Sequence, residues 1–217
     1  ISKAEDGRLE NHPKVIEIGA VFHELVEQWR FTANKKGLEL KFTIGDQNVN
    51  PTDNKVIVPL YYVEVDPERI REVFTNLFDN AVKYTAKGSI SISLSGDDTT
   101  VQASITDTGT GIADEDIPHL FQKFYRIDNS ATRQVGGTGL GLYICRKIVD
   151  LYHGHILVDS ELGHGSKFTV SIPRIREPDA TIPQASTATS NTLAAAKAAP
   201  VPGKPRPAVP VQKVIVK

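Results

Sequence analysis

The chain has 217 residues, of which 40% are hydrophobic and 24% are charged, and its formal net charge is -1. This composition is typical of a soluble globular protein of one or two domains, and no apolar run reaches the roughly 18 residues of a membrane span. The near-neutral charge gives no reason to expect nucleic acid as a partner, and the single Cys145 excludes an internal disulfide.

The first half of the chain alternates helical and strand patterns. Apolar residues follow helical spacing from Ala20 to Trp29, and the pattern runs toward Gly37, a typical helix stop. Residues 38–44 alternate polar and apolar side chains, and residues 61–65 are rich in strand-forming types. Both of these segments are therefore predicted to be strands.

The next predicted helix starts at Asp66, which can cap free amides, and at Pro67, which suits the first helical position. One face collects the apolar residues Ile70, Val73, Phe74, Leu77, Phe78 and Ala81. The opposite face collects the polar residues Glu72, Asn76, Asn80 and Lys83. An asparagine oxygen suits Mg²⁺ and a lysine suits phosphate, although this face alone could equally be ordinary solvated surface.

Two further strands are predicted at residues 89–95 and 101–106, with a tight turn at Asp98-Thr99. Asp107 ends the second strand and precedes two glycines, Gly109 and Gly111, where a ligand can approach the backbone closely. An ionised carboxylate only accepts hydrogen bonds, so it can select the exocyclic amine of adenine over the carbonyl of guanine. Taken alone, Asp-Thr-Gly is also typical of a simple turn.

A long connection follows from Ile112 to Val135, beyond the length of an ordinary connector. We interpret it as a mobile lid anchored by Phe121, Phe124 and Tyr125, although aromatic residues at such spacing are more often part of a core.

A glycine run at residues 136–141 opens a predicted apolar helix at residues 142–151. Free backbone amides and the positive end of the helix dipole favour phosphate binding at such a position. The run matches neither the dinucleotide-binding fingerprint nor the phosphate loop of other nucleotide folds. Cys145, inside this helix, is expected to be a small core residue.

The last predicted element is a hairpin around Gly163-His164-Gly165, between Val158 and residues 168–172. The residues after it are rich in alanine and proline, and their basic residues outnumber the acidic ones. Such a composition cannot bury enough surface to offset chain entropy, so this tail is predicted to be disordered. A tether or docking segment for another protein is the alternative.

Four segments of the chain together resemble the N box, first glycine box, F box and second glycine box of sensor histidine kinase catalytic domains. They are residues 76–84, 107–111, 121–126 and 137–142. These kinases share an ATPase superfamily with gyrase, heat-shock chaperones and mismatch-repair proteins. The resemblance covers about residues 15–173, and residues 2–9 are similar to the end of the dimerisation helix that precedes the domain.

The resemblance implies a fold and a site. The fold is α+β, a two-layer sandwich whose mixed, mostly antiparallel sheet is covered by helices on one face. Asn80, Asn76 and Lys83 are implied as the catalytic residues, Asn80 as the Mg²⁺ ligand and the other two as groups that approach the phosphates. Asp107 is implied as the residue that recognises adenine. The other implied ATP-binding residues are Tyr84, Gly109, Gly111, Ile112, Tyr125, Arg126, Arg133, Gly137, Thr138, Gly139, Leu140, Gly141 and Leu142.

The implied organisation has three parts. Residues 1–14 are the end of a dimerisation and phosphoacceptor helix with its linker, residues 15–175 the ATP-binding catalytic domain, and residues 176–217 the disordered basic tail. Because the sequence begins at Ile1 and lacks methionine, we expect a cytoplasmic fragment of a longer homodimeric protein, which could carry a membrane anchor upstream. None of the six histidines has the setting of the family's phosphoacceptor.

The implied reaction moves the γ-phosphoryl group of ATP to a histidine and then to an aspartate on the receiver domain of a response regulator. The isolated chain is expected to bind Mg-ATP without phosphorylating itself. A serine kinase of the anti-sigma type and a non-catalytic ATP-binding module are the alternatives. The lid motif favours the histidine kinase over the former, and the retention of Asn80 and Asp107 argues against the latter.

Overall fold

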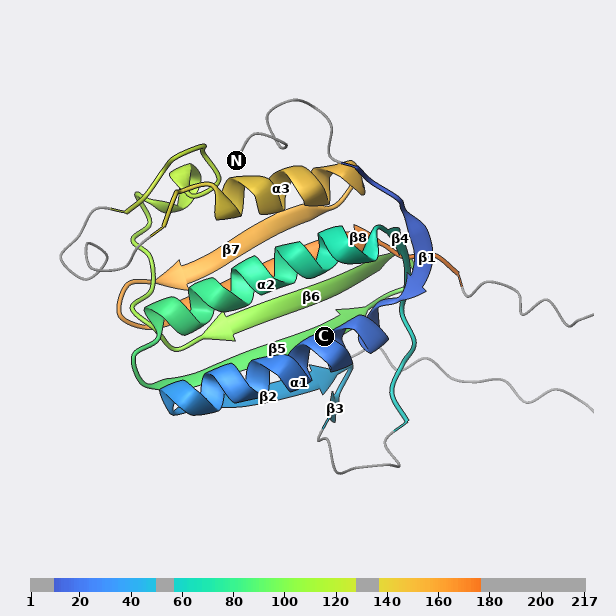
Figure 1. Cartoon of the computed structure of the whole chain (residues 1–217), viewed down its shortest axis with the longest axis horizontal. Helices are drawn as coiled ribbons and strands as arrows, with labels where there is room; N and C mark the ends of the chain where they lie inside the picture. The colour runs from blue at the N-terminus through green and yellow to red at the C-terminus, as the bar shows by residue number, and fades with distance from the viewer. Residues whose placement is uncertain (1–9, 50–56, 128–136, 177–217) are drawn as a thin grey trace, which may run out of the picture. The chain divides into compact units, whose positions relative to one another are not determined.

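Three helices cover one face of a six-stranded sheet in the computed structural model, which describes residues 10–49, 57–127 and 137–176 (Figure 1). The helices are α1 (Ile18–Lys36), α2 (Pro67–Tyr84) and α3 (Gly141–Leu151), with a short 3-10 turn at Ile117–His119. None of the helices in these residues has the length and apolar character needed to cross a membrane.

The sheet has the strand order β3-β2-β5-β6-β8-β7. Its strands are β2 (Leu38–Ile44), β3 (Gln47–Asn48), β5 (Gly88–Gly96), β6 (Thr100–Asp107), β7 (His155–Glu161) and β8 (Gly165–Pro173). β2 runs parallel to β5, and every other neighbouring pair is antiparallel. The predicted α+β sandwich with a mixed, mostly antiparallel sheet is therefore confirmed.

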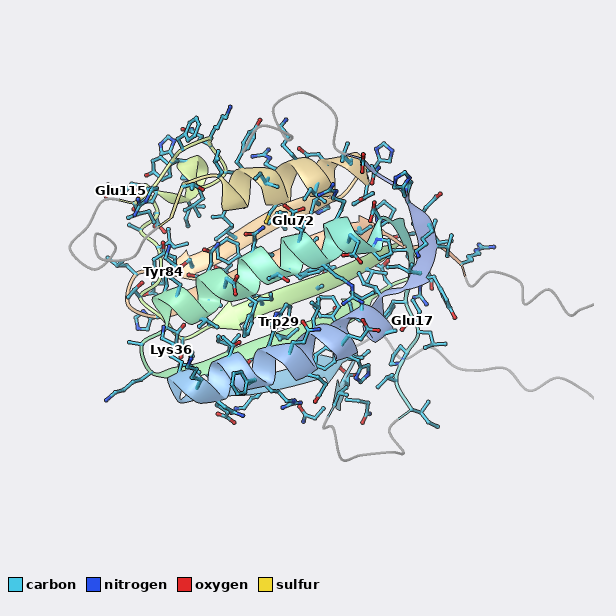
Figure 2. The ribbon with its side chains drawn as sticks, viewed as in Figure 1. Glu17, Trp29, Lys36, Glu72, Tyr84 and Glu115 are labelled. Carbon is cyan, nitrogen blue, oxygen red and sulfur yellow. The ribbon has the colours of Figure 1, made fainter. Side chains whose placement is uncertain are left out.

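A separate two-stranded sheet joins β1 (Lys14–Glu17) to β4 (Tyr62–Val65). The strand at β4 was expected from its composition, but β1 was not predicted. Its last residue, Glu17, caps α1, because its carboxylate accepts the N–H groups of Gly19 at 2.9 Å and Ala20 at 2.7 Å (Figure 2). The other end of α1 stops at Gly37 in the left-handed conformation, as the sequence predicts.

The start of α2 holds the chain that precedes β1. Asp66 caps the helix through Oδ1, which accepts the N–H groups of Glu68 at 2.9 Å and Arg69 at 3.4 Å. Its Oδ2 accepts the N–H of His12 at 2.8 Å. Burial alone would raise the pKa of Asp66, but the hydrogen bonds from these three backbone amides outweigh it and lower the pKa below the usual 3.8.

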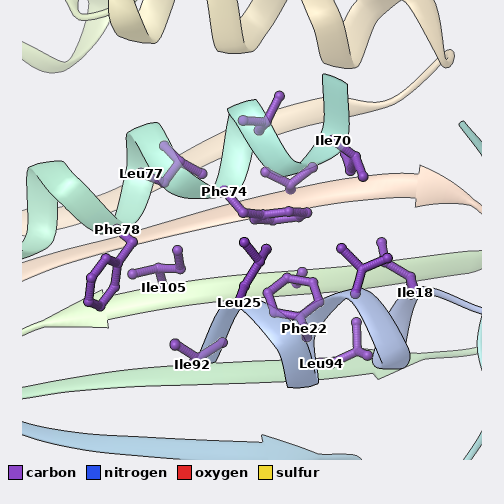
Figure 3. Close-up of a cluster of buried hydrophobic side chains, with 14 of the residues drawn as sticks. Ile18, Phe22, Leu25, Ile70, Phe74, Leu77, Phe78, Ile92, Leu94 and Ile105 are labelled. Atoms are coloured by element: carbon purple, nitrogen blue, oxygen red, sulfur yellow. The ribbon is translucent and has the colours of Figure 1, made fainter. Parts of the chain in front are cut away.

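The core lies between the helices and the sheet (Figure 3). The buried residues of α2 are those of the predicted apolar face: Ile70, Val73, Phe74, Leu77, Phe78 and Ala81. Aromatic rings join α1 to this face, since Phe22 lies 4.5 Å from Phe74 and Trp29 stacks on Phe78 at 4.4 Å. The polar face of α2 is thereby turned away from α1.

The elements that carry the sequence motifs meet at one end of the sheet. The last turn of α2, the first turn of α3, the end of β6 and the turn between β7 and β8 all lie on the left in Figure 1. This meeting of elements places three of the four motif segments, residues 76–84, 107–111 and 137–142, in one region.

Candidate functional site

A cavity of about 540 Å³ lies at this end of the sheet. All four motif segments contribute to its lining, together with the loop that follows β6. Figure 2 labels Tyr84 at the end of α2 and Glu115 in that loop, both of which line it. The predicted site residues in the lining are Asn76, Asn80, Lys83, Tyr84, Asp107, Gly111, Ile112, Tyr125, Arg126, Gly137, Thr138, Gly139, Gly141 and Leu142.

The polar face of α2 lies close to the second glycine segment where both line the cavity. Asn76 Oδ1 lies 3.4 Å from the position that a Cβ on Gly141 would occupy, and Lys83 Nζ lies 3.1 Å from the same position on Gly137. Asn76 also hydrogen-bonds with the thiol of Cys145. An amide and an ammonium group are thus held beside exposed backbone, an arrangement suited to an anion.

Cys145 is buried, and burial raises the pKa of its thiol to about 12. The expectation of a small core residue is confirmed, because a thiol with this pKa stays protonated and unreactive at neutral pH.

Asp107 also lines the cavity and is only 5% exposed. Its Oδ1 accepts the N–H of Gly109 at 2.8 Å and the hydroxyl of Thr85 at 3.4 Å, and the N–H of Ser166 donates to the same carboxylate. Burial raises the pKa of Asp107 above the usual 3.8, and these hydrogen bonds oppose the rise. The carboxylate is a fixed acceptor in a largely dry wall.

The first glycine segment passes close to the turn between β7 and β8. Gly111 has a φ of 66°, and a Cβ there would lie 1.9 Å from the carbonyl oxygen of Glu161. Only glycine combines this left-handed backbone with so close an approach. Gly109 is absent from the cavity lining and instead supports Asp107 by its hydrogen bond.

The second glycine segment leads into α3, whose first turn has no side-chain cap. The N-cap residue, Leu140, makes no side-chain capping bond, and the first turn of the helix contains no acidic residue. Gly141 and Leu142 line the cavity, so the positive end of the helix dipole faces it. Leu140 itself does not belong to the lining, and Arg133 lies outside the described residues.

The three aromatic residues expected to anchor the lid differ in the contacts that they make. Phe121 packs against the core, and Tyr125 donates its hydroxyl to Asp116 Oδ1 at 2.6 Å, a bond that raises the pKa of Tyr125. Phe124 is 60% exposed, so its side chain does not anchor the lid in the core. Its backbone N–H instead donates to the Gly139 carbonyl at 3.0 Å, which ties this loop to the second glycine segment.

Several residues of the site were missed in the sequence. Thr85 and Ser166 hold Asp107, and Ser166 also lines the cavity. Ser166 faces Asp107 in the register of β6 with β8, so its role becomes visible only when the strand pairing is known. The apolar part of the lining includes Leu120, Leu162 and Phe168, whose sequence pattern is that of ordinary core or turn residues.

The donor chemistry of the cavity fits an implied Mg²⁺. In the described parts of the chain, no group of three or more His, Cys, Asp or Glu side chains is arranged to hold a metal. Asn76 and Asn80, whose side chains carry amide oxygens, line the cavity. Mg²⁺ keeps several waters and needs only one or two protein oxygens when substrate phosphates supply the rest, so these neutral donors suit it.

Comparison with known proteins agrees with this geometry. Residues 65–176 match the family described as histidine kinase-, DNA gyrase B-, and HSP90-like ATPase. A hybrid signal transduction histidine kinase L of Dictyostelium discoideum is 37% identical over 175 residues, which cover 78% of this chain and 10% of that protein.

Two solved structures have a TM-score of 0.61 with this chain. The catalytic domain of the histidine kinase ThkA is 26% identical, with 75% of this chain and 98% of that chain covered. The full-length kinase ShkA in complex with AMPPNP is 27% identical, with 77% of this chain and 32% of that chain covered.

The similarity concerns one part of larger proteins, because this chain spans from 10% to 28% of the length of the first curated relatives it matches. Those relatives are named as sensor proteins or histidine kinases, and no name among them favours a serine kinase or a non-catalytic module. The matching segment includes α2, α3 and the strands that frame the cavity. The chain therefore belongs to the family of histidine kinase-, DNA gyrase B- and HSP90-like ATPases, and within it resembles the ATPase domain of sensor histidine kinases.

Proposed function

We propose that this chain is the ATP-binding catalytic domain of a two-component sensor histidine kinase and donates the γ-phosphoryl group of ATP to a histidine of its parent protein. The observation that carries the proposal is that Asn80, Lys83 and Asp107 line one cavity. They offer a metal ligand, a cation for phosphate and an acceptor for a nucleobase amine. A nucleoside triphosphate needs all three kinds of group.

In the proposed complex the adenine lies at the Asp107 end. The carboxylate accepts a hydrogen bond from the exocyclic amine, a donor that guanine lacks at this position. The phosphates extend toward Lys83 and the first turn of α3, where backbone amides and the helix dipole favour negative charge. Tyr84, Ile112 and Leu142 border the nucleotide, and the segment with Tyr125 and Arg126 covers it.

The chain would hold Mg²⁺ through Asn80, with Asn76 beside the phosphates. When bound, the metal neutralises charge on the phosphate oxygens. Lys83 holds further phosphate charge, and the positive end of α3 does the same from the other side. The contribution of these groups is to fix the triphosphate in one orientation and to stabilise negative charge during transfer.

The proposed reaction is a displacement at phosphorus. A histidine nitrogen attacks the γ-phosphorus while the bond to the β,γ-bridging oxygen breaks. ADP leaves with that oxygen and its electron pair, and the imidazole gives up one proton. The products are ADP and a phosphohistidine, from which the receiver domain of a response regulator would take the phosphoryl group onto an aspartate.

The acceptor histidine comes from outside the cavity in this proposal. No histidine occurs among the described residues that line the cavity. His23 is exposed on α1, and His153 belongs to the turn before β7. The parent protein would work as a dimer, and each of its subunits would present a phosphoacceptor helix to the mouth of the site.

The test is the binding of a fluorescent ATP analogue with and without Mg²⁺. The chain is expected to bind the analogue more tightly with Mg²⁺, and Asn80→Ala is expected to remove this metal dependence. Asp107→Ala is expected to abolish measurable binding. Asn34→Ala on the exposed side of α1 and Asp159→Ala on β7 are matched controls that leave binding unchanged.

A second experiment tests the acceptor. The chain is incubated with ATP labelled in the γ-phosphate, and acid-labile phosphate on the protein is measured. No label is expected on the isolated chain. Labelled phosphohistidine on the isolated chain would refute the view that the acceptor lies elsewhere. In the binding experiment, nucleotide binding without any preference for adenine would refute the assignment of Asp107.

A further inference from the structure

Ser160 of β7 lies behind the cavity and does not line it. Its hydroxyl takes part in three hydrogen bonds: Oγ accepts the N–H of Ile112 at 2.9 Å and lies 2.8 Å from the carbonyl oxygen of Gly165 and 3.0 Å from Ser166 Oγ. The side chain is half-buried, whereas its neighbours Asp159 and Glu161 are exposed. Ser160 is therefore the inward-facing polar group of this strand end.

The bond to Ile112 fixes the first glycine segment. At the start of the segment the Thr108 N–H donates to the Ser89 carbonyl at 3.2 Å, and Thr108 Oγ1 accepts the Ser89 N–H at 3.0 Å. Four further hydrogen bonds hold the rest of the segment and the residue after it: Gly109 N–H to Asp107 Oδ1 at 2.8 Å, Thr110 N–H to the Tyr84 carbonyl at 3.2 Å, Gly163 N–H to the Thr110 carbonyl at 2.7 Å, and Ile112 N–H to Ser160 Oγ at 2.9 Å. Of these four, only the last depends on a side chain that does not line the cavity. The segment is anchored by backbone at its start and by the Ser160 hydroxyl at its end.

The other contacts of Ser160 reach the opposite side of the same wall. Ser166 lines the cavity, lies opposite Asp107 in the strand register, and donates its N–H to the Asp107 carboxylate. A serine hydroxyl can accept one hydrogen bond while it donates another. Ser160 thus joins Ile112 on one side of the adenine end to the Asp107–Ser166 edge on the other.

We propose that Ser160 is a positioning residue that sets the width of the adenine end of the cavity, an inference that rests on the proposed function. The hydroxyl keeps Ile112 at a fixed separation from Asp107, so that a flat base fits between the apolar wall and the carboxylate. Without it the Ile112 N–H loses its partner and the segment moves to recover one from water. The base then loses contact with one of the two walls.

The position of Ser160 predicts which ligands are affected. Its contacts lie at the Asp107 end, whereas the phosphates are assigned to Lys83 and the start of α3. Ser160→Ala is therefore expected to weaken the binding of adenosine and of ATP by the same factor. That factor is about tenfold, the effect of losing one hydrogen bond in the cavity wall. The effect of Mg²⁺ on ATP affinity is expected to stay unchanged. Ser160→Thr restores the hydroxyl and is expected to restore the affinity.

The experiment measures the dissociation constants of adenosine and of Mg-ATP by displacement of a fluorescent ATP analogue from the full chain. The variants are Ser160→Ala, Ser160→Thr, and Asp159→Ala as a neighbouring control on the exposed face of β7. Thermal unfolding without nucleotide checks that each variant folds. Should Ser160→Ala not fold, Ser160→Cys, with a weakly hydrogen-bonding thiol of similar size, replaces it, with an expected loss of about threefold.

The outcomes separate the two proposals. If the unmodified chain binds no adenine nucleotide, the proposed function fails. If it binds and Ser160→Ala binds equally well, or loses affinity for ATP but not for adenosine, the positioning role alone is overturned. Equal loss for both ligands in variants that the unfolding measurement shows to be folded, with recovery in Ser160→Thr, supports it.

Discussion

Substitution of Gly111 tests whether the cavity depends on the close packing of the first glycine segment against the backbone of Glu161. The perturbation is Gly111→Ala, and Gly37→Ala at the end of α1 is the matched control. Both glycines have left-handed backbones, with φ of 66° at Gly111 and 73° at Gly37. At Gly37 an added Cβ meets nothing within 4 Å, whereas at Gly111 it meets the Glu161 carbonyl oxygen at 1.9 Å and its carbon at 2.7 Å.

These contacts give the expected magnitudes. Gly37→Ala carries only the cost of a left-handed conformation, about 1 kcal/mol of unfolding free energy. Gly111→Ala carries the same cost and an overlap with backbone atoms, which no side-chain rotation can relieve. Overpacking of this kind adds about 1–3 kcal/mol, so the total loss at Gly111 is about 2–4 kcal/mol.

The assay is urea unfolding of both variants beside the unmodified chain, with ATP-analogue binding measured on the folded fraction. Gly111→Ala is expected to unfold at a clearly lower urea concentration than Gly37→Ala and to bind nucleotide more weakly, since relief of the overlap moves the cavity wall. Equal midpoints for the two variants would show that the close approach to Glu161 has no energetic weight. Unchanged nucleotide binding in Gly111→Ala would show that this contact does not influence the site.

Three further expectations follow from buried groups. The ionised form of Asp107 accepts a hydrogen bond from the adenine amine, and the pKa of Asp107 is raised. The affinity for adenosine should therefore be highest above that raised pKa and fall as the pH drops through it. Asp107→Asn, which cannot titrate, should show a flat profile, and a sloping one would contradict the assignment. Asp66→Ala should lower the unfolding free energy by about 0.5–2 kcal/mol through loss of the α2 cap. Because the pKa of Asp66 is lowered in the folded chain, its contribution to the unfolding free energy should be fully present above pH 3.8. The contribution should vanish as the pH falls through the lowered pKa, as acid unfolding of the variant would reveal. Phe78→Ala should cost about 3–5 kcal/mol in thermal or urea unfolding, while Phe31→Ala, 74% exposed on α1, should cost little; similar losses for the two would be inconsistent with the observed core.

Local patterns in the sequence were sufficient for the elements that carry the motifs. The apolar face of α2 was predicted residue by residue, because burial on one side of a helix repeats with the helical period. Asp66 and Pro67 marked its start through capping chemistry that involves only neighbouring residues. The sharing of one cavity by Asn80 and Asp107 followed from the resemblance, which supplied the long-range arrangement that local patterns lack.

Features that depend on pairing between distant segments could not be predicted. β1 has four residues and no clear alternation, so nothing in its sequence indicates that it pairs with β4. The parallel neighbour of β2 is β5, although β3 and β4 lie between them in the chain. Thr85, Ser160 and Ser166 have short hydroxyl side chains common in any strand or turn, and their roles arise from the residues that the fold brings to them.

The pairing of β6 with β8 has a consequence for the order of assembly. β5 and β6 are joined by a tight turn and close a small loop, whereas β8 must return to β6 across the lid and α3. Closing the larger loop costs more chain entropy, so we expect the β5–β6 hairpin to form first and the β8 contact late. Because Asp107 gains Ser166 only through that pairing, we expect a ribosome-bound chain that still lacks β8 to carry the Asp107 carboxylate without one of the hydrogen bonds that hold it.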